Sequence, residues 1–169
     1  MGDDSAIATN DDQLPFRVMP AVTVDNEHFW RGGAEGELRF LRCARCGYWI
    51  HPPAPICPEC LGREVSVHAV SGEAVVLTYT VNHQLWYPNL DPPYVVAIVS
   101  LPEQDDLRLT TNIVNCEPDD VDFGMSVRVT FMEYPDDRGN VWLPMFEPTP
   151  FEPAVPEAAQ PEGTDRATP

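Results

Sequence analysis

The chain has 169 residues, which is enough for one domain of average size with a small extra module and too few for two full domains. Ten basic residues stand against 27 acidic ones, and the formal net charge of −17 would repel a polyphosphate backbone. All the basic residues are arginines, so chemistry that needs a lysine amine is excluded. The sequence has neither an apolar run of about 18 residues nor a secretory leader, which predicts a cytoplasmic protein that does not enter a membrane.

Both ends of the chain have the composition of disordered segments. Residues 1–13 contain four aspartates and no basic residue, and residues 147–169 contain five acidic residues and six of the 19 prolines. Such segments bury too little apolar surface to offset the entropy lost on ordering. We therefore predict a disordered acidic N-terminus over residues 1–20 and a disordered tail rich in Pro and Glu over residues 147–169.

A short helix is predicted before the first cysteine. Asp25 is expected to be its N-cap, and Gly32 and Gly33 are expected to end it. Phe29 and Trp30 add two large apolar side chains to this helix. They either pack on a neighbouring strand or anchor a partner subunit, and the sequence does not decide between these alternatives.

Four of the five cysteines form two Cys-x-x-Cys turns that are ten residues apart, at Cys43, Cys46, Cys57 and Cys60. Two such turns supply the four thiolates of a closed tetrahedral metal site, and we predict that the metal is Zn2+, with iron as the alternative. Four protein ligands leave no position for water or substrate, so this zinc has a structural role. It contributes on the order of 10 kcal/mol to folding of the module, because its ligands are gathered only in the folded state.

Two other interpretations of the cysteines are weaker. A redox-active pair belongs in a βαβ unit, which the sequence does not show, and disulfides need an oxidising compartment. Gly47 lets the chain turn after the first pair without a Cβ clash. Three arginines flank the first turn and either reduce the charge of the thiolate cluster or face a partner or an anionic ligand; they are Arg39, Arg42 and Arg45.

β-structure is predicted from residue 64 onward, because Val, Ile, Thr and aromatic residues occur in runs bounded by Gly, Pro, Asp and Asn. Residues 65–82 are expected to form one long strand that bends at Ser71 and Gly72. Five strands in this order predict a closed OB-type barrel over residues 64–146, after a helix and zinc ribbon over residues 21–63, and hence a mainly β fold. The other strands are expected at residues 94–101, 107–115, 126–134 and 141–146, with a short helix at residues 117–120.

One long loop, residues 83–93, lies between two of the predicted barrel strands. Long loops in compact domains are often functional. Leu85, Trp86 and Tyr87 would expose a large apolar area, so they either plug one end of the barrel or contact a partner, and partner contact is favoured. His83, at the start of the loop, is the histidine that we single out for a functional test.

No catalytic set is predicted. Cys116 is the one nucleophile candidate outside the two cysteine pairs, and the acidic residues that follow it raise rather than lower the pKa of a thiol. The four histidines show no metal-ligand spacing, and the many carboxylates fit a solvated acidic face. We therefore expect no activity from this chain alone.

The segment 29–146 resembles a family of acyl-CoA-associated OB-fold proteins with a rubredoxin-like zinc ribbon, long catalogued as a domain of unknown function. This chain departs from the family at Glu103-Gln104-Asp105-Asp106, where many members have a Glu-Gly turn. The resemblance rests on Gly36-Glu37-Leu38-Arg39-Phe40, on the two cysteine pairs with Gly47, Pro52, Pro53, Pro55 and Pro58, and on Tyr79-Thr80-Val81 and Pro93-Tyr94-Val95-Val96-Ala97.

The resemblance implies a non-catalytic accessory subunit that binds a thiolase-superfamily enzyme acting on acyl-CoA. The chain is similar to the partner of a lipid-transfer-protein-type, thiolase-like aldolase that cleaves a 17-hydroxy steroid acyl-CoA, which implies a heterotetramer with a CoA thioester as its ligand. The alternatives are a subunit of a MaoC-like enoyl-CoA hydratase or of an acetyl-CoA acyltransferase, and a free OB-fold nucleic-acid-binding protein, which the acidic charge disfavours. Residues expected to contact the partner or the acyl-CoA channel are Phe29, Trp30, His83, Leu85, Trp86 and Tyr87.

Overall fold

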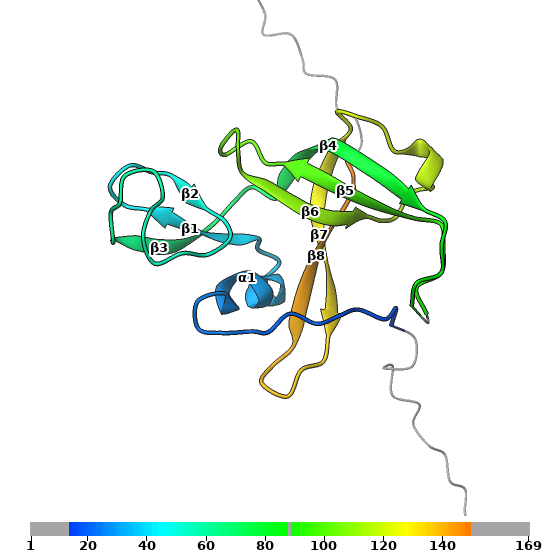
Figure 1. Ribbon diagram of the computed structural model, residues 1–169, viewed down its shortest axis with the longest axis horizontal. Helices are drawn as coiled ribbons and strands as arrows, with labels where there is room; N and C mark the ends of the chain where they lie inside the picture. Colours follow the sequence, from blue (N-terminus) through cyan, green and yellow to red (C-terminus); the bar gives the residue numbers. More distant parts are fainter. Residues whose placement is uncertain (1–13, 88, 150–169) are drawn as a thin grey trace, which may run out of the picture.

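The computed structural model describes residues 14–87 and 89–149. A small three-stranded sheet lies beside a closed five-stranded barrel, with one short helix next to both (Figure 1). This confirms a mainly β fold in which a helix and a ribbon precede an OB-type barrel. No helix in the described part of the chain is long and apolar enough to span a bilayer. The elements in chain order are α1 (Glu27–Arg31), the 3-10 helix η2 (Gly32–Glu35), β1 (Arg39–Cys43), β2 (Trp49–Ile50), β3 (Val65–Ala69), β4 (Glu73–Asn82), β5 (Tyr94–Ser100), β6 (Arg108–Ile113), the 3-10 helix η3 (Pro118–Asp120), β7 (Ser126–Tyr134) and β8 (Val141–Pro148).

The barrel has the strand order β4-β5-β6-β8-β7 and closes on itself through β4 and β7. Its neighbouring strands are antiparallel except for β6 and β8, which run parallel and pair through Ile113 and Phe146. Burial alternates along β5, so that Val95, Ala97 and Val99 point into the core. This alternation follows from the two-residue repeat of a strand with one face on a core. The sequence pattern therefore predicted the barrel correctly.

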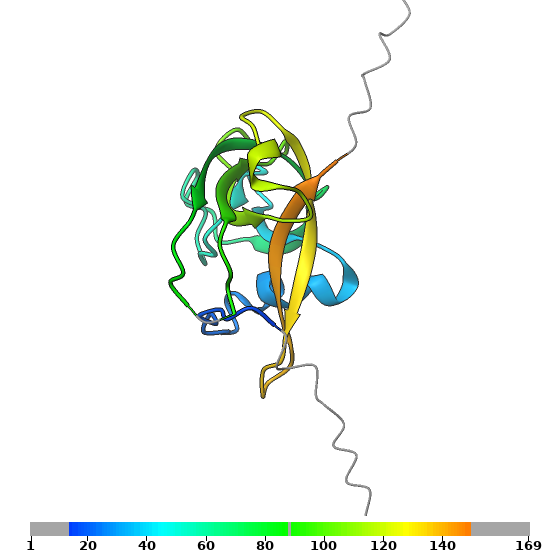
Figure 2. The same ribbon diagram turned by 90° about the vertical axis from the view of Figure 1, so that its right-hand side faces the viewer.

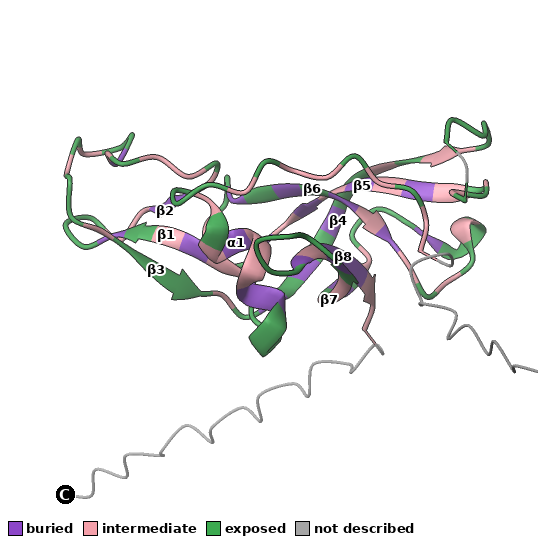
Figure 3. Ribbon diagram, turned by 90° about the horizontal axis from the view of Figure 1, so that it is seen from below, coloured by how far each residue is buried: buried purple, intermediate pink, exposed green. Residues whose placement is uncertain are grey.

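The expectation that residues 65–82 form one bent barrel strand is wrong. β3 pairs along its whole length with β1, from Arg39 opposite Ala69 to Cys43 opposite Val65, and so completes the ribbon sheet β2-β1-β3. Between β3 and β4 the backbone takes a left-handed conformation at Gly72, with φ of +80°, and this separates the two strands. Most of β3 is exposed (Figure 3), because it covers the edge of β1 and does not face the barrel core. The ribbon thus extends past residue 64, and the first barrel strand is β4 alone.

The helix also differs in detail from the expectation. Its N-cap is Asn26 and not Asp25, and the Asn26 carboxamide bonds to the preceding backbone, accepting from the Thr23 N–H at 2.8 Å. Gly32 and Gly33 do not stop the helical path, which continues as η2. A Cβ at Gly33 would lie 2.5 Å from the Cβ of Trp142, so this glycine lets the helix approach β8 closely.

Residues 14–20, expected to belong to a disordered N-terminus, run along the barrel from the side of the β4–β5 loop toward α1 (Figure 1, Figure 2). We call this segment the strap. The Tyr134 hydroxyl donates to the Pro15 carbonyl at 2.8 Å, and the Phe16 ring stacks on Tyr87 with centroids 4.9 Å apart. β8 also continues to Pro148, two residues into the expected tail. Residues 1–13 and 150–169 lie outside the described residues, so their disorder stays a prediction.

Candidate metal centre and contact surfaces

The four cysteines come together at one end of the ribbon. The sulfur of Cys43 lies 3.6 Å from that of Cys60, the sulfur of Cys46 lies 3.6 Å from that of Cys57, and all four lie within 4.8 Å of one another. Tetrahedral ligands about 2.3 Å from a zinc ion would be separated by about 3.8 Å. The four sulfurs therefore fit a single tetrahedral ion with no open position.

The two Cys-x-x-Cys turns have the same backbone geometry. The Gly47 N–H donates to the Cys43 carbonyl at 2.9 Å, and the Leu61 N–H donates to the Cys57 carbonyl at 3.0 Å. Both residues after the second cysteine are left-handed, with φ of +78° at Gly47 and +58° at Leu61. Gly47 was expected from the sequence, whereas Leu61 is a leucine where glycine is preferred, so the second turn is strained.

Two of the three flanking arginines support the turns through backbone carbonyls. Arg42 Nε donates to the Gly47 carbonyl at 3.1 Å, and its guanidinium lies 5.0 Å from the Trp49 ring centroid. Arg45 Nη1 donates to the Cys60 carbonyl at 3.3 Å. Arg39 instead forms ion pairs with Glu35 and Glu37, so it does not serve the cluster.

The thiols of Cys43 and Cys46 differ in their pKa values. The hydrogen bond from the Cys46 N–H lowers the pKa of Cys43 to about 7 against the effect of burial. The pKa of Cys46 rises to about 12 although the Tyr48 N–H favours its thiolate, because burial and the neighbouring sulfurs favour its thiol. Four thiolates this close repel one another, so full ionisation requires a cation between them.

The structure separates the two aromatic residues of α1. Phe29 is 3% exposed and packs against Phe40 and His51, with ring centroids 5.6 and 5.0 Å away. Trp30 is half-buried and meets Phe29 edge to face, with centroids 4.6 Å apart. In this chain Phe29 therefore takes the packing role, and Trp30 is the more accessible of the two.

The β4–β5 loop exposes its apolar residues and does not plug the barrel. Leu85, Trp86 and Tyr87 are 55%, 66% and 45% exposed, and His83 at the loop start is also exposed. Trp86 is held in place because its Nε1 donates to Asn82 Oδ1 at 2.9 Å. The strap adds Phe16, 44% exposed, which sequence reasoning missed because it fell in the segment expected to be disordered. We call Phe16, Leu85, Trp86 and Tyr87 the aromatic edge.

A second group that the sequence did not reveal fastens the ribbon to the barrel. Gln104, in the β5–β6 loop, accepts from the Trp49 N–H at 2.8 Å and donates from Nε2 to the Trp49 carbonyl at 3.1 Å. The Tyr48 hydroxyl donates to Asp106 Oδ2 at 2.6 Å, and this bond raises the pKa of Tyr48 to about 12. The turn that departs from the family pattern thus has a structural role here.

Cys116 lies apart from the sulfur cluster and is partly buried against the barrel core. Burial, followed by the nearby Asp120 and Glu117 carboxylates, raises the pKa of its thiol. A nucleophilic cysteine needs the opposite environment, one that favours the thiolate. The surroundings of Cys116 therefore favour an inert thiol.

Fold and site together define a zinc-ribbon protein with a C-terminal OB barrel. The family model for the ChsH2 rubredoxin-like zinc ribbon domain matches residues 30–66, and the model for the ChsH2 C-terminal OB-fold domain matches residues 67–132. The two models together match more than half of the chain. The chain belongs to the ChsH2, or DUF35, family.

The relatives of this chain have names that indicate different roles. The 3-oxo-4,17-pregnadiene-20-carboxyl-CoA hydratase alpha subunit of Mycobacterium tuberculosis is 32% identical over 135 residues, which cover 79% of this chain and 42% of that subunit. A DUF35 domain-containing scaffold protein of Methanocaldococcus jannaschii is 37% identical over 99 residues, covering 57% of this chain and 69% of that protein. A solved chain of an Ltp2-ChsH2(DUF35) aldolase is 35% identical with a TM-score of 0.67, covering 77% of this chain and 98% of that one. The chain spans about two-fifths of the curated hydratase subunits that it matches.

Proposed function

We propose that this chain is a non-catalytic accessory subunit of an enzyme that acts on CoA thioesters. One of its relatives is named as a hydratase subunit and another as a scaffold protein. The chain also covers nearly all of a solved chain whose structure is named as an Ltp2-ChsH2(DUF35) aldolase. The unfavourable environment of Cys116 also supports a role without chemistry of its own.

The partner in this proposal is a thiolase-superfamily enzyme of the lipid-transfer-protein type, in a heterotetramer. Its reaction is the retro-aldol cleavage of a 17-hydroxy steroid acyl-CoA, and the CoA thioester is a ligand of the complex. The aldolase name of the structural relative and the steroid-like CoA substrate of the hydratase relative support this class. The accessory chain stabilises the enzyme and shapes the entrance of its acyl-CoA channel.

The aromatic edge is the observation on which the docking proposal depends. Its four side chains are each 44% to 66% exposed and come from two segments that meet through the Phe16–Tyr87 stack. A contiguous patch of exposed apolar side chains marks a contact site. Aromatic side chains that become buried in an interface supply most of its affinity. We infer that the partner covers this edge, with His83 and Trp30 as flanking contacts.

Zinc in this proposal is structural. Cys43 and Cys57 are almost fully buried, and Ile50 of β2 packs against them in the ribbon core. The ion would hold together a module whose own apolar core is small. Loss of the ion is therefore expected to disturb the ribbon first.

A partner of the MaoC-like enoyl-CoA hydratase type is the second candidate. The match to hydratase alpha subunits, 35% and 32% identical, favours it, since those subunits contain a segment like this chain. In that case the same accessory role applies with a different enzyme.

Affinity capture with the full chain tests these alternatives. The chain is immobilised, incubated with extract of its source cells, and the bound proteins are identified and quantified by mass spectrometry. The Trp86→Ser and Tyr87→Ser double variant removes the centre of the aromatic edge. Phe123→Ser is the matched control, because Phe123 is 65% exposed and lies in the segment after η3.

We expect a thiolase-like enzyme in near-stoichiometric amount, retained by the Phe123→Ser variant and reduced at least about tenfold by the double variant. A MaoC-like hydratase with the same behaviour would establish the second candidate instead. A chain that elutes alone, or a partner that both variants retain equally, contradicts docking through the aromatic edge.

A further inference from the structure

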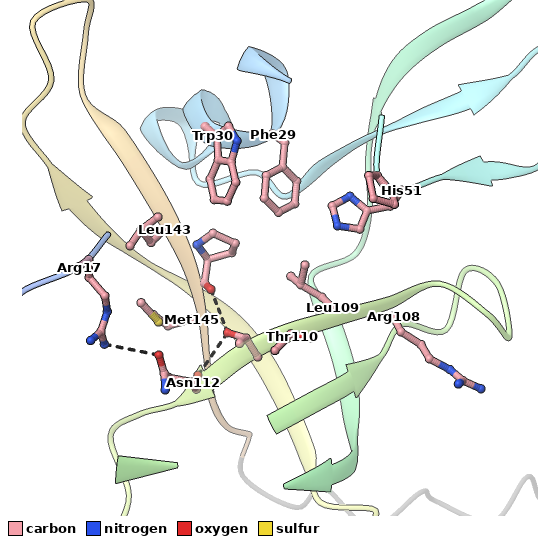
Figure 4. A pocket seen from close by; sticks show the side chains of 13 residues that line it. Arg17, Phe29, Trp30, His51, Arg108, Leu109, Thr110, Asn112, Leu143 and Met145 are labelled. Atoms are coloured by element: carbon pink, nitrogen blue, oxygen red, sulfur yellow. Dashed lines mark hydrogen bonds between the residues drawn. The ribbon is translucent and has the colours of Figure 1, made fainter. Parts of the chain in front are cut away.

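A cavity of about 510 Å3 lies where α1, the ribbon and the barrel meet. Figure 4 shows Phe29 and Trp30 on one side of it, facing Met145 and Thr110 on the barrel side, with Leu143 and His51 at opposite ends. The barrel side is the junction of β6 and β8. Most of the lining is apolar, and it is assembled from five separate parts of the chain.

Arg17 brings a positive charge to this cavity from the strap. Its Nη2 donates to Asn112 Oδ1 at 3.4 Å, whereas its Nε is buried and has no hydrogen-bond partner among the described residues. The chain has 27 acidic residues, yet the ion pairs in its described part involve Arg39 and Arg128 and not Arg17. A buried, unpaired N–H of a guanidinium costs free energy until an acceptor reaches it.

His51 adds a second unpaired polar atom to the same lining. Its Nδ1 is buried without a partner in the described structure, and its ring lies 5.0 Å from both the Phe29 and the Phe40 ring. Burial, followed by the charge of His28, lowers the pKa of His51, which favours the neutral ring. A neutral imidazole is able to donate to, or accept from, a polar group of a ligand.

The charge of the cavity matches one anionic group. Arg108, the other arginine of the lining, is exposed, and Figure 4 shows its guanidinium directed away from the remaining lining side chains. One guanidinium pairs well with one carboxylate. The several phosphate charges of a nucleotide would stay uncompensated in a chain of net charge −17.

We propose that this cavity binds an apolar monocarboxylic acid, whose carboxylate pairs with Arg17 and whose apolar body lies between α1 and strands β6 and β8. All the residues that line this site come from this chain. The inference therefore goes beyond the accessory role and does not depend on which enzyme is the partner.

Binding of two matched probes tests the inference. Pyrenebutyrate and pyrenebutanol share one apolar ring system and differ in the carboxylate, and the fluorescence anisotropy of each is measured against the concentration of the full chain. We expect the acid to bind at least about tenfold more tightly than the alcohol, because a hydrogen bond between charged partners adds this much. Arg17→Met should abolish the preference while leaving the alcohol's affinity unchanged, and the exposed Arg138→Met should preserve it.

A second variant tests the shape of the site. Thr110 is exposed at the cavity wall, so Thr110→Phe fills the space without disturbing the core, and it should weaken both probes at least about fivefold. The proposal is overturned if the acid shows no saturable binding, if acid and alcohol bind equally, or if Arg17→Met binds the acid as tightly as the native chain. It is also overturned if Thr110→Phe leaves the affinities unchanged.

Discussion

The Gln104 side chain joins the β5–β6 loop to the backbone of Trp49 in the ribbon, and Gln104→Leu removes this connection with little change in size. In the native chain its amide accepts from the Trp49 N–H at 2.8 Å and donates to the Trp49 carbonyl at 3.1 Å. Trp49 is 8% exposed, so water has little access to either group. The leucine therefore leaves a buried N–H and a buried C=O without partners.

The size of the effect follows from these two groups. Each buried polar group left unsatisfied costs about 1–3 kcal/mol, and the apolar leucine recovers part of that cost. We expect Gln104→Leu to lower the free energy of unfolding by about 2–4 kcal/mol, a large share of the roughly 5–15 kcal/mol of a typical domain. Gln104→Glu keeps an acceptor for the Trp49 N–H but offers its carbonyl no donor, so its effect should be intermediate.

Urea unfolding followed by tryptophan fluorescence measures this difference, with the slope m expected to stay unchanged. Asp105→Ala is the matched control, because Asp105 is an exposed neighbour in the same loop, and its effect should stay within about 0.5 kcal/mol. If Gln104→Leu and Asp105→Ala unfold at the same urea concentration, the hydrogen bonds to Trp49 do not stabilise the ribbon and the reasoning is refuted.

Three further predictions concern the metal centre and its surroundings. Cys60→Ser should abolish binding of one zinc ion per chain, measured by atomic absorption, while Cys116→Ser binds zinc normally; a full zinc content in both variants contradicts the four-ligand site. Leu61→Gly should raise the free energy of unfolding by up to about 1 kcal/mol, because it relieves a left-handed leucine, and a decrease in the same urea assay would show that the turn is not strained. The hydrogen bond between Tyr48 and Asp106 raises the pKa of Tyr48 from 10.0 to about 12 and lowers that of Asp106 from 3.8. The stabilisation from this hydrogen bond should be complete between pH 3.8 and pH 10.0, fall as the pH rises from 10.0 toward 12, and fall as the pH drops below 3.8. If the free energy of unfolding of the native chain exceeds that of Tyr48→Phe by the same amount over the whole pH range, this prediction is contradicted.

The metal centre was predictable because its information is local. Each Cys-x-x-Cys turn is fixed by four consecutive residues, and four soft ligands in two such turns have few other uses. The signal for Leu61 was also present, since it occupies the same position in the second turn as Gly47 in the first. The barrel strands were predictable for a similar reason, as alternation along a strand such as β5 depends on neighbouring residues.

Strand partners were harder to predict than strands. Residues 65–69 are β-structure, as expected, but periodicity does not tell whether a strand pairs with β1 or continues into the barrel. The contact between Gln104 and Trp49 is harder still, because it joins residues 55 positions apart through one amide. A polar residue in a loop looks the same in sequence whether its amide is solvated or bonded to a buried strand.

The sequence did contain a signal for the strap, but treating residues 1–20 as one segment hid it. All four N-terminal aspartates fall in residues 1–13, whereas residues 14–20 include Leu14, Phe16 and Val18 and no acid. Composition therefore changes at residue 13, and Pro15 and Phe16, soon after this change, contact Tyr134 and Tyr87. The boundary expected at residue 20 joined two segments with different compositions.

Two truncations separate the contributions of these segments. A chain that starts at residue 14 keeps Phe16 and Arg17, so it should retain the native preference for pyrenebutyrate over pyrenebutanol. A chain that starts at residue 21 loses the guanidinium of the cavity and the ring that stacks on Tyr87. It should bind both probes equally and capture the partner enzyme less well, while its ribbon still binds zinc. Equal behaviour of the two truncations in both assays would mean that the strap contributes neither to the cavity nor to the aromatic edge.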